Sequence, residues 1–152
     1  MPQPWTYRHA SKEYAAFLED VKAAMSLTSD NMAYTAVDGV FQCFRARLTA
    51  QQGLDFAAVL PAVLRAIFVA GWRPGDPLRP WSDRATLISE VKALRRHHNL
   101  TPDHAIDATA YALRRCTRAR DLDRVLAGLG PQAQAFWHVD VTNPRALDQR
   151  II

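Results

Sequence analysis

Histidine and aspartate side chains, which can bind metal ions, gather around residue 100. His97 and His98 close one predicted helix, and His104 lies near the start of the next with Asp103 and Asp107 beside it. Metal sites on helices use histidines four residues apart or paired Glu-x-x-His motifs, and neither spacing occurs here. A histidine at a helix C-terminus is also favoured by the helix dipole without any ligand. We therefore expect no metal site and no cofactor.

The two cysteines are the candidate nucleophiles. Cys43 and Cys116 are 73 residues apart, and each lies in or beside a predicted apolar helix stripe, where cysteine is usually a small buried hydrophobe. Arg114, Arg115 and Arg118 could lower the pKa of Cys116 and make it reactive. The matching positions of the two cysteines favour packing instead. Because phosphate-binding glycine motifs are also absent, we expect no catalytic residues and a protein that is not an enzyme.

Carboxylates are scattered singly along the chain. Glu19 and Glu90 fall at roughly corresponding places in two predicted helices, with Lys22 and Lys92 close by. Such pairs are typical of a solvent-facing helix surface. We expect neither glutamate to take part in a site.

The positive charge is concentrated in one stretch, residues 92–124. This stretch accounts for the whole formal net charge of +4, with eight basic residues against four acidic ones. It could bind nucleic acid. It could equally be a solvated surface in an arginine-rich protein, and this second interpretation is favoured because charge runs usually serve solubility. The basic residues are Lys92, Arg95, Arg96, Arg114, Arg115, Arg118, Arg120 and Arg124.

The segment "GWRPGDPLRPWSD" is the best candidate for a binding surface. Trp72, Arg73, Arg79 and Trp81 stand among prolines that restrict the backbone. Tryptophan and arginine dominate binding energy in many interfaces, since they stack and pair with carboxylates. The alternative is that the tryptophans hold this linker in the groove between two halves of the molecule.

The C-terminal tail is the second candidate surface. Asn143 and Pro144 can start a short helix that places Leu147 and Ile151 on one face. Such a helix could dock on its own bundle, on a second copy of the chain or on another protein.

The elements that must position these residues are predicted to be helices throughout. Apolar residues recur at helical spacing, and no stretch alternates as a half-buried strand would. Cap and first-turn residues predict about eight helices. Their expected starts are Ser11, Thr28, Thr49 with Gln52 in a capping box, Pro61, Ser82 or Asp83, Thr101 with Pro102 in the first turn, a short helix around Leu122, and Pro131.

The two halves of the chain repeat one another. "LTSD" from Leu27 recurs as "LTPD" from Leu100, "FLEDVK" from Phe17 as "LISEVK" from Leu87, and "LPAVLRAIF" from Leu60 as "LGPQAQAFW" from Leu129. The order is the same in both halves, which predicts an internal repeat. We expect an all-α protein of two related helical bundles in one compact domain. Its parts are an N-terminal segment 1–10, repeat A 11–72, a linker 73–82, repeat B 83–137 and a tail 138–152.

Four stretches resemble a bacterial family known as domain of unknown function 2267. They are "YRHASKEYAAFLEDVKAAMSL", "AYTAVDGVFQCFRARL", "LPAVLRAIFVAGWRPGDP" and a second half ending in "AFW". The resemblance covers residues 7–137 and implies an all-α protein of two related repeats. It implies no catalytic residues, and the chain departs from the family pattern after Trp137.

The remaining features bear on location and partners. No apolar run reaches the roughly 20 residues that a bilayer span needs, and the first residues lack the apolar core of a signal peptide. We therefore expect a cytoplasmic protein without membrane contact. The favoured function is a non-enzymatic module that binds another protein or a second copy of itself, and the alternative is nucleic-acid binding through residues 92–124.

Overall fold

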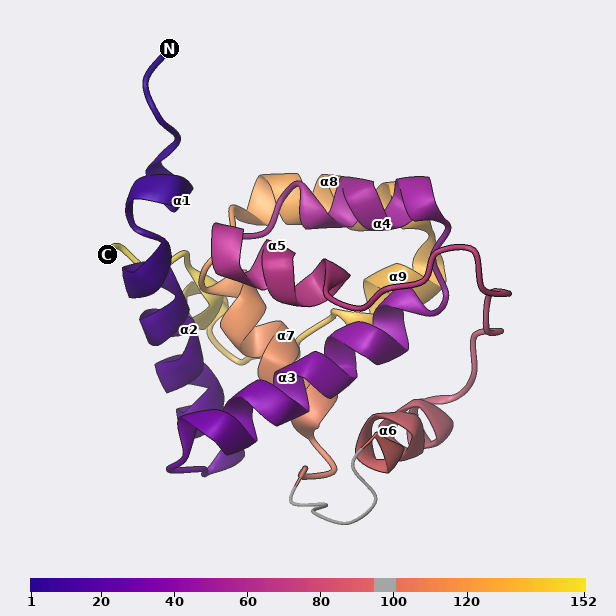
Figure 1. Cartoon of the computed structure of the whole chain (residues 1–152). Coiled ribbons are helices and arrows are strands. Elements are labelled where there is room, and N and C mark those ends of the chain that lie inside the picture. Colours follow the sequence, from indigo (N-terminus) through magenta and orange to yellow (C-terminus); the bar gives the residue numbers. More distant parts are fainter. Residues whose placement is uncertain (95–100) are drawn as a thin grey trace.

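The computed structural model describes residues 1–94 and 101–152. Within this part the chain is helical and contains no β-strand (Figure 1). The predictions for Arg95, Arg96, His97, His98 and Leu100 concern residues outside it. The helices are α1 (Trp5–Arg8), α2 (Ala10–Met25), α3 (Asp30–Arg45), α4 (Ala50–Ala57), α5 (Ala62–Val69), α6 (Arg84–Ala93), α7 (Ala105–Arg114), α8 (Ala119–Leu129), α9 (Pro131–Phe136) and a 3₁₀ turn, η1 (Pro144–Leu147).

The predicted all-α fold is confirmed, and several helix starts follow the expected chemistry. The Thr49 hydroxyl accepts from the Gln52 amide while the Gln52 side chain accepts from the Thr49 amide, a complete capping box. Asp83 caps α6 by accepting from the Thr86 amide at 2.8 Å. Pro131 opens α9, where its missing N–H costs nothing.

Three predicted starts are wrong. Ser29, not Thr28, caps α3, because its extended backbone lets its hydroxyl accept from the Met32 amide. Helix α2 begins at Ala10 directly after the single turn α1, so Ser11 lies inside it. Helix α7 begins at Ala105, and Pro102 stands in a turn before it, where its carbonyl accepts from the Ala105 amide.

Helices from the two halves of the chain interlock. Helix α2 packs most extensively on α7, and α3 packs on α6, so each half covers the apolar stripe of the other. Figure 1 shows α4 and α8 side by side along one edge of the molecule, and the two helices are in contact. An internal repeat would produce such exchanged pairs, although the repeat itself stays a prediction.

An aromatic cluster from both halves fills the centre. The Trp137 ring stacks on Phe56 at 5.5 Å between centroids and meets Phe44 edge-on at 5.3 Å. Large aromatic rings dominate the energetics of a core through their buried area. The cluster comprises Phe41, Phe44, Phe56, Phe68, Phe136 and Trp137, all almost fully buried.

No helix in the described ranges is both long and apolar enough to cross a membrane.

Candidate functional site

The linker leaves α5, passes the C-terminal end of α3 and enters α6. Arg45, the last residue of α3, fixes the start of the linker. Its Nη1 donates to the carbonyls of Phe68 and Ala70, both at 2.9 Å. The Arg79 amide then donates to the carbonyl of Ala46, the C-cap of α3, at 2.9 Å. These bonds satisfy carbonyls at helix ends and fix the path of the linker.

The two tryptophans of the linker face the bundle. The Trp72 indole covers Gly53 of α4 so closely that a Cβ there would lie 2.0 Å from Cη2 of the ring. The Trp81 ring lies 6.0 Å from Phe44 and 6.1 Å from Phe136. Both indoles are half-buried, as expected if the tryptophans hold the linker in a groove.

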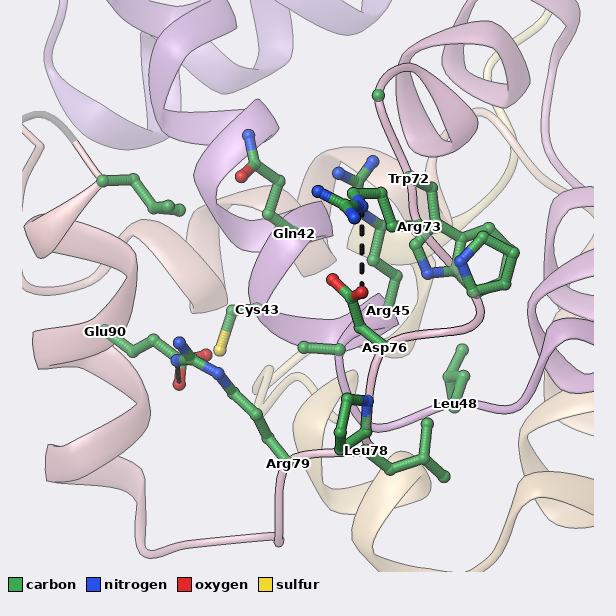
Figure 2. A pocket seen from close by; sticks show the side chains of 15 residues that line it. Gln42, Cys43, Arg45, Leu48, Trp72, Arg73, Asp76, Leu78, Arg79 and Glu90 are labelled. Atoms are coloured by element: carbon green, nitrogen blue, oxygen red, sulfur yellow. Dashed lines mark hydrogen bonds and ion pairs between the residues drawn. The ribbon is translucent and has the colours of Figure 1, made fainter.

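A groove of about 260 Å³ remains between the end of α3, the linker and α6 (Figure 2). We call it the linker groove. Cys43 and Glu90 point toward each other on one side of it, and Arg45, Trp72 and Arg73 stand on the other.

Glu90 is clamped by two arginines. Both oxygens of its carboxylate accept from Arg47 of the segment after α3, and Oε1 also accepts from Arg79 of the linker. Burial alone would raise the pKa of Glu90, but hydrogen bonds from Arg47, Cys43 and Arg79 outweigh it and lower the pKa to about 2. The prediction of a solvent-facing Glu90 is wrong, because the arginines of the other elements converge on this face of α6.

Cys43 is held as a thiol beside this clamp. Its sulfur lies 3.8 Å from the Leu87 carbonyl and 3.5 Å from Nη1 of Arg47. Burial and the nearby Glu90 carboxylate raise the pKa of Cys43 to about 12. A thiol with this pKa is almost entirely protonated at neutral pH and is a poor nucleophile.

The outer rim of the linker groove is apolar and positively charged. Leu78 of the linker is 48% exposed, and Leu94 after α6 is 45% exposed. The side chain of Arg73 is 82% exposed, and its only ion pair in the described part of the chain is a long one of 3.7 Å to Asp76. Of the predicted linker surface, Arg73 belongs to this rim, and the side chain of Arg79 is also 60% exposed.

The sequence matches a family described as "Uncharacterized conserved protein (DUF2267)" over residues 14–136. The chain belongs to the DUF2267 family. None of the curated proteins compared with the chain matches it. The whole linker groove lies within the DUF2267 match, whereas the tail after Trp137 lies outside it.

The tail residues Leu147 and Ile151 do not share a helical face. Only the 3₁₀ turn η1 forms, capped by Asn143, whose side chain accepts from the Arg145 amide at 3.1 Å. Leu147 is half-buried and Ile151 is fully exposed. The predicted amphipathic helix is wrong, because the segment after Leu147 is extended and binds the bundle through Arg150.

Arg150 completes a second carboxylate clamp. It donates to Asp20 of α2 at 2.8 Å, and Arg115 approaches the same buried carboxylate at 3.6 Å. The Arg150 amide donates to the carbonyl of Arg115, the C-cap of α7, at 2.7 Å. In this arrangement the tail docks on its own bundle.

The equivalence of Cys43 and Cys116 stays a prediction. The C-caps of α3 and α7, Ala46 and Arg115, are 69 residues apart, so a register set by these helix ends would align Cys43 with Ala112 instead. Cys116 is buried, and burial followed by the charges of Glu13 and Asp20 raises its pKa. The arginines near Cys116 therefore do not produce a reactive thiolate.

Most basic residues in the described part of 92–124 are already paired with carboxylates. Lys92 binds Asp103, Arg114 binds Asp123, Arg115 binds Asp20 and Arg124 binds Asp121. Arg118 and Arg120 are exposed. An arginine that is paired with a carboxylate adds less net positive charge to a surface that would bind phosphates. This pairing weakens the nucleic-acid interpretation.

The candidate metal ligands that the structure describes point to other partners. His104 contacts the Ala24 carbonyl at 3.0 Å, and Asp107 binds Arg84. No group of three or more His, Cys, Asp and Glu side chains suited to a metal occurs within residues 1–94 and 101–152.

Proposed function

We propose that this protein is a non-enzymatic cytoplasmic module that binds another protein through the rim of the linker groove. The observation that carries the proposal is the exposure of Leu78, Leu94 and Arg73 around a groove whose walls are fixed by the Glu90 clamp. Apolar side chains ringed by arginine are typical of protein-binding surfaces.

The chemistry inside the linker groove supports a binding role over a catalytic one. Cys43 has a raised pKa, and the carboxylate of Glu90 is already neutralised by two arginines. A general base or nucleophile needs a free group with a pKa near the working pH. Neither residue meets this requirement.

The charges around the linker groove favour an acidic partner segment. Arg45, Arg73 and Arg79 face two carboxylates, Asp76 and Glu90, which leaves an excess positive charge. The expected occupant is a segment of another protein that places an apolar side chain between Leu78 and Leu94 and a carboxylate at Arg73. A second copy is a weaker candidate, because two chains of net charge +4 repel each other.

Site-specific photo-crosslinking in the host cell tests this proposal. A crosslinker at position 78 should give one discrete adduct with another protein, and Arg73→Glu should abolish it by reversing the charge that attracts the partner. A crosslinker at position 54 is the matched control, since Leu54 is 56% exposed on α4 outside the groove. Adducts that are the same from both positions, or that contain only a second copy of this chain, would contradict the proposal.

A further inference from the structure

A cavity of about 700 Å³ lies beside the two chain termini, on another face of the molecule from the linker groove. Figure 1 shows the C-terminus beside α1 and α2, while the N-terminal residues extend away from α1. We call it the terminal cavity. Its walls come from α1, the start of α2, the turn between α4 and α5, the turn between α7 and α8 with the first residues of α8, and the tail, and include Trp5, Glu13, Val59, Arg118 and Ile152. Its volume is in the range of small-molecule sites, about 300–1,000 Å³.

On the linker side of the molecule, a comparable position is occupied by a tryptophan side chain. Arg79 and Arg150 make matching contacts, because each amide binds a helix C-cap carbonyl and each guanidinium binds a carboxylate. Two residues after Arg79, Trp81 places its indole against Phe44 and Phe136. Two residues after Arg150 stands Ile152, which is 43% exposed. The terminal cavity is therefore the counterpart of the place that an indole occupies on the linker side.

Glu13 adds a specific chemical requirement. This residue is only 7% exposed and lines the terminal cavity, yet its Oε1 has no hydrogen-bond partner among the described residues. A buried carboxylate oxygen without a donor is costly, and a ligand that brings an N–H group would relieve this cost.

We propose that the terminal cavity binds a small aromatic molecule that carries an N–H donor, of the indole class. The ring packs against Val59 and Trp5, and the N–H donates to Oε1 of Glu13. This inference does not depend on the proposed function, since none of these residues lines the linker groove.

Calorimetric titration of the full chain with indole and with 1-methylindole tests the proposal. The two probes have nearly the same ring, but the second lacks the N–H donor. We expect indole to bind about tenfold more tightly or better, because a hydrogen bond to a charged group contributes about 1.5–3 kcal/mol. Absence of indole binding, or equal affinity for the two probes, would overturn the assignment.

Two variants test separately the hydrogen bond to Glu13 and the location of the ligand in the terminal cavity. Glu13→Leu removes the acceptor and should bring the affinity for indole down to that for 1-methylindole. Ile152→Trp places an indole at the position corresponding to Trp81, so it should abolish binding of both probes and raise the melting temperature. Glu19→Leu is the control, because Glu19 lies on the same helix and pairs with Lys22 outside the cavity.

The test stays conclusive even if one of these variants does not fold. If Glu13→Leu does not fold, Ile152→Trp alone decides whether the cavity is the binding site. Indole binding that survives Ile152→Trp would place the ligand elsewhere. Tighter binding of the peptide acetyl-Pro-Trp-Ser-amide than of indole would assign the cavity to a protein segment and overturn the small-molecule proposal.

Discussion

The linker and the tail hold the molecule by the same contacts with opposite electrostatic results. In each, an arginine amide binds a helix C-cap carbonyl and its guanidinium binds a carboxylate that a second arginine also approaches. The pKa of Glu90 is nevertheless lowered, whereas burial raises the pKa of Asp20 and Arg115 and Arg150 only partly oppose it. Arg47 meets Glu90 with two nitrogens, but Arg115 stays 3.6 Å from Asp20. Hydrogen bonds from Arg47, Cys43 and Arg79 thus lower the pKa of Glu90, whereas the charges of Arg115 and Arg150 only partly offset the burial of Asp20.

Removing Glu90 should have the largest effect. Glu90→Ala leaves the buried guanidinium of Arg47 without its carboxylate, and breaking a buried ion pair from one side costs about 3–5 kcal/mol. Urea denaturation monitored by circular dichroism would measure the loss. Glu19→Ala, which removes an exposed pair with Lys22, should change the free energy of unfolding by less than about 1 kcal/mol. Equal effects of the two substitutions would show that the Glu90 clamp is not structural.

Lowering the pH should change the stability contributed by the Glu90 clamp and by the Asp20 clamp in opposite directions. The pKa of Glu90 is lowered from its usual value to about 2, so its stabilising charge is fully present above pH 4.5 and is lost as the pH falls toward 2. The loss amounts to about 3 kcal/mol, since one pKa unit is worth about 1.4 kcal/mol.

Asp20 should behave in the opposite way. Its raised pKa favours the protonated form in the folded state, a contribution present at low pH and lost as the pH rises through the folded pKa. Chemical denaturation between pH 2 and 7 should show a flatter profile for Glu90→Gln than for the wild type. Asp20→Asn should leave the acid-induced loss in place and cost little at pH 7, and a large cost would refute the contrast.

Two glycines test how tightly the linker is held. In Gly53→Ala, the new methyl group would collide with the Trp72 ring and displace the linker, which should destabilise the protein by about 1–3 kcal/mol. Gly128 of α8 has no atom within 4 Å of its Cβ position, so Gly128→Ala should stabilise the protein by about 0.5–1 kcal/mol through helix propensity. Thermal melts of the two variants should therefore shift in opposite directions.

The tail clamp should give the smallest effect. Arg150→Met should cost about 1 kcal/mol, because its pair with Asp20 is partly exposed on the arginine side. In an Asp20→Asn background the same substitution should cost much less, and the difference measured by a double-mutant cycle is the coupling between the two residues. Additive effects would mean that the tail is held by its backbone bond to Arg115 alone.

The sequence predicts the helices well because their signals are local. The capping box at Thr49 and the apolar spacing of Phe17, Val21 and Met25 depend on residues within a few positions. Wrong starts arise where two polar residues compete: Thr28 and Ser29 can both cap, and only the backbone geometry selects Ser29. Pro102 suits a first helical turn equally well, but α7 begins three residues later, at Ala105.

The site was harder to predict because its contacts are distant in sequence. Arg47 and Glu90 are 43 residues apart, and Arg150 and Asp20 are 130 apart. One signal was available: the alignment of "FLEDVK" with "LISEVK" places Asp20 opposite Glu90, on the buried side of each helix beside a valine. Because Lys22 and Lys92 stand close by, the sequence favours solvent-exposed ion pairs instead. The apolar rim residue Leu94 has no such signal.

The packing of α2 on α7 has a consequence for how the protein folds during synthesis. Helix α2 packs on α3 and α5 but most extensively on α7, which begins some 80 residues after α2 ends, so the first half of the chain alone leaves part of α2 uncovered. Contacts between such distant segments form late and slow the folding reaction. Until α7 has emerged, part of the apolar face of α2 is exposed, and such surface makes a partly folded chain prone to aggregation.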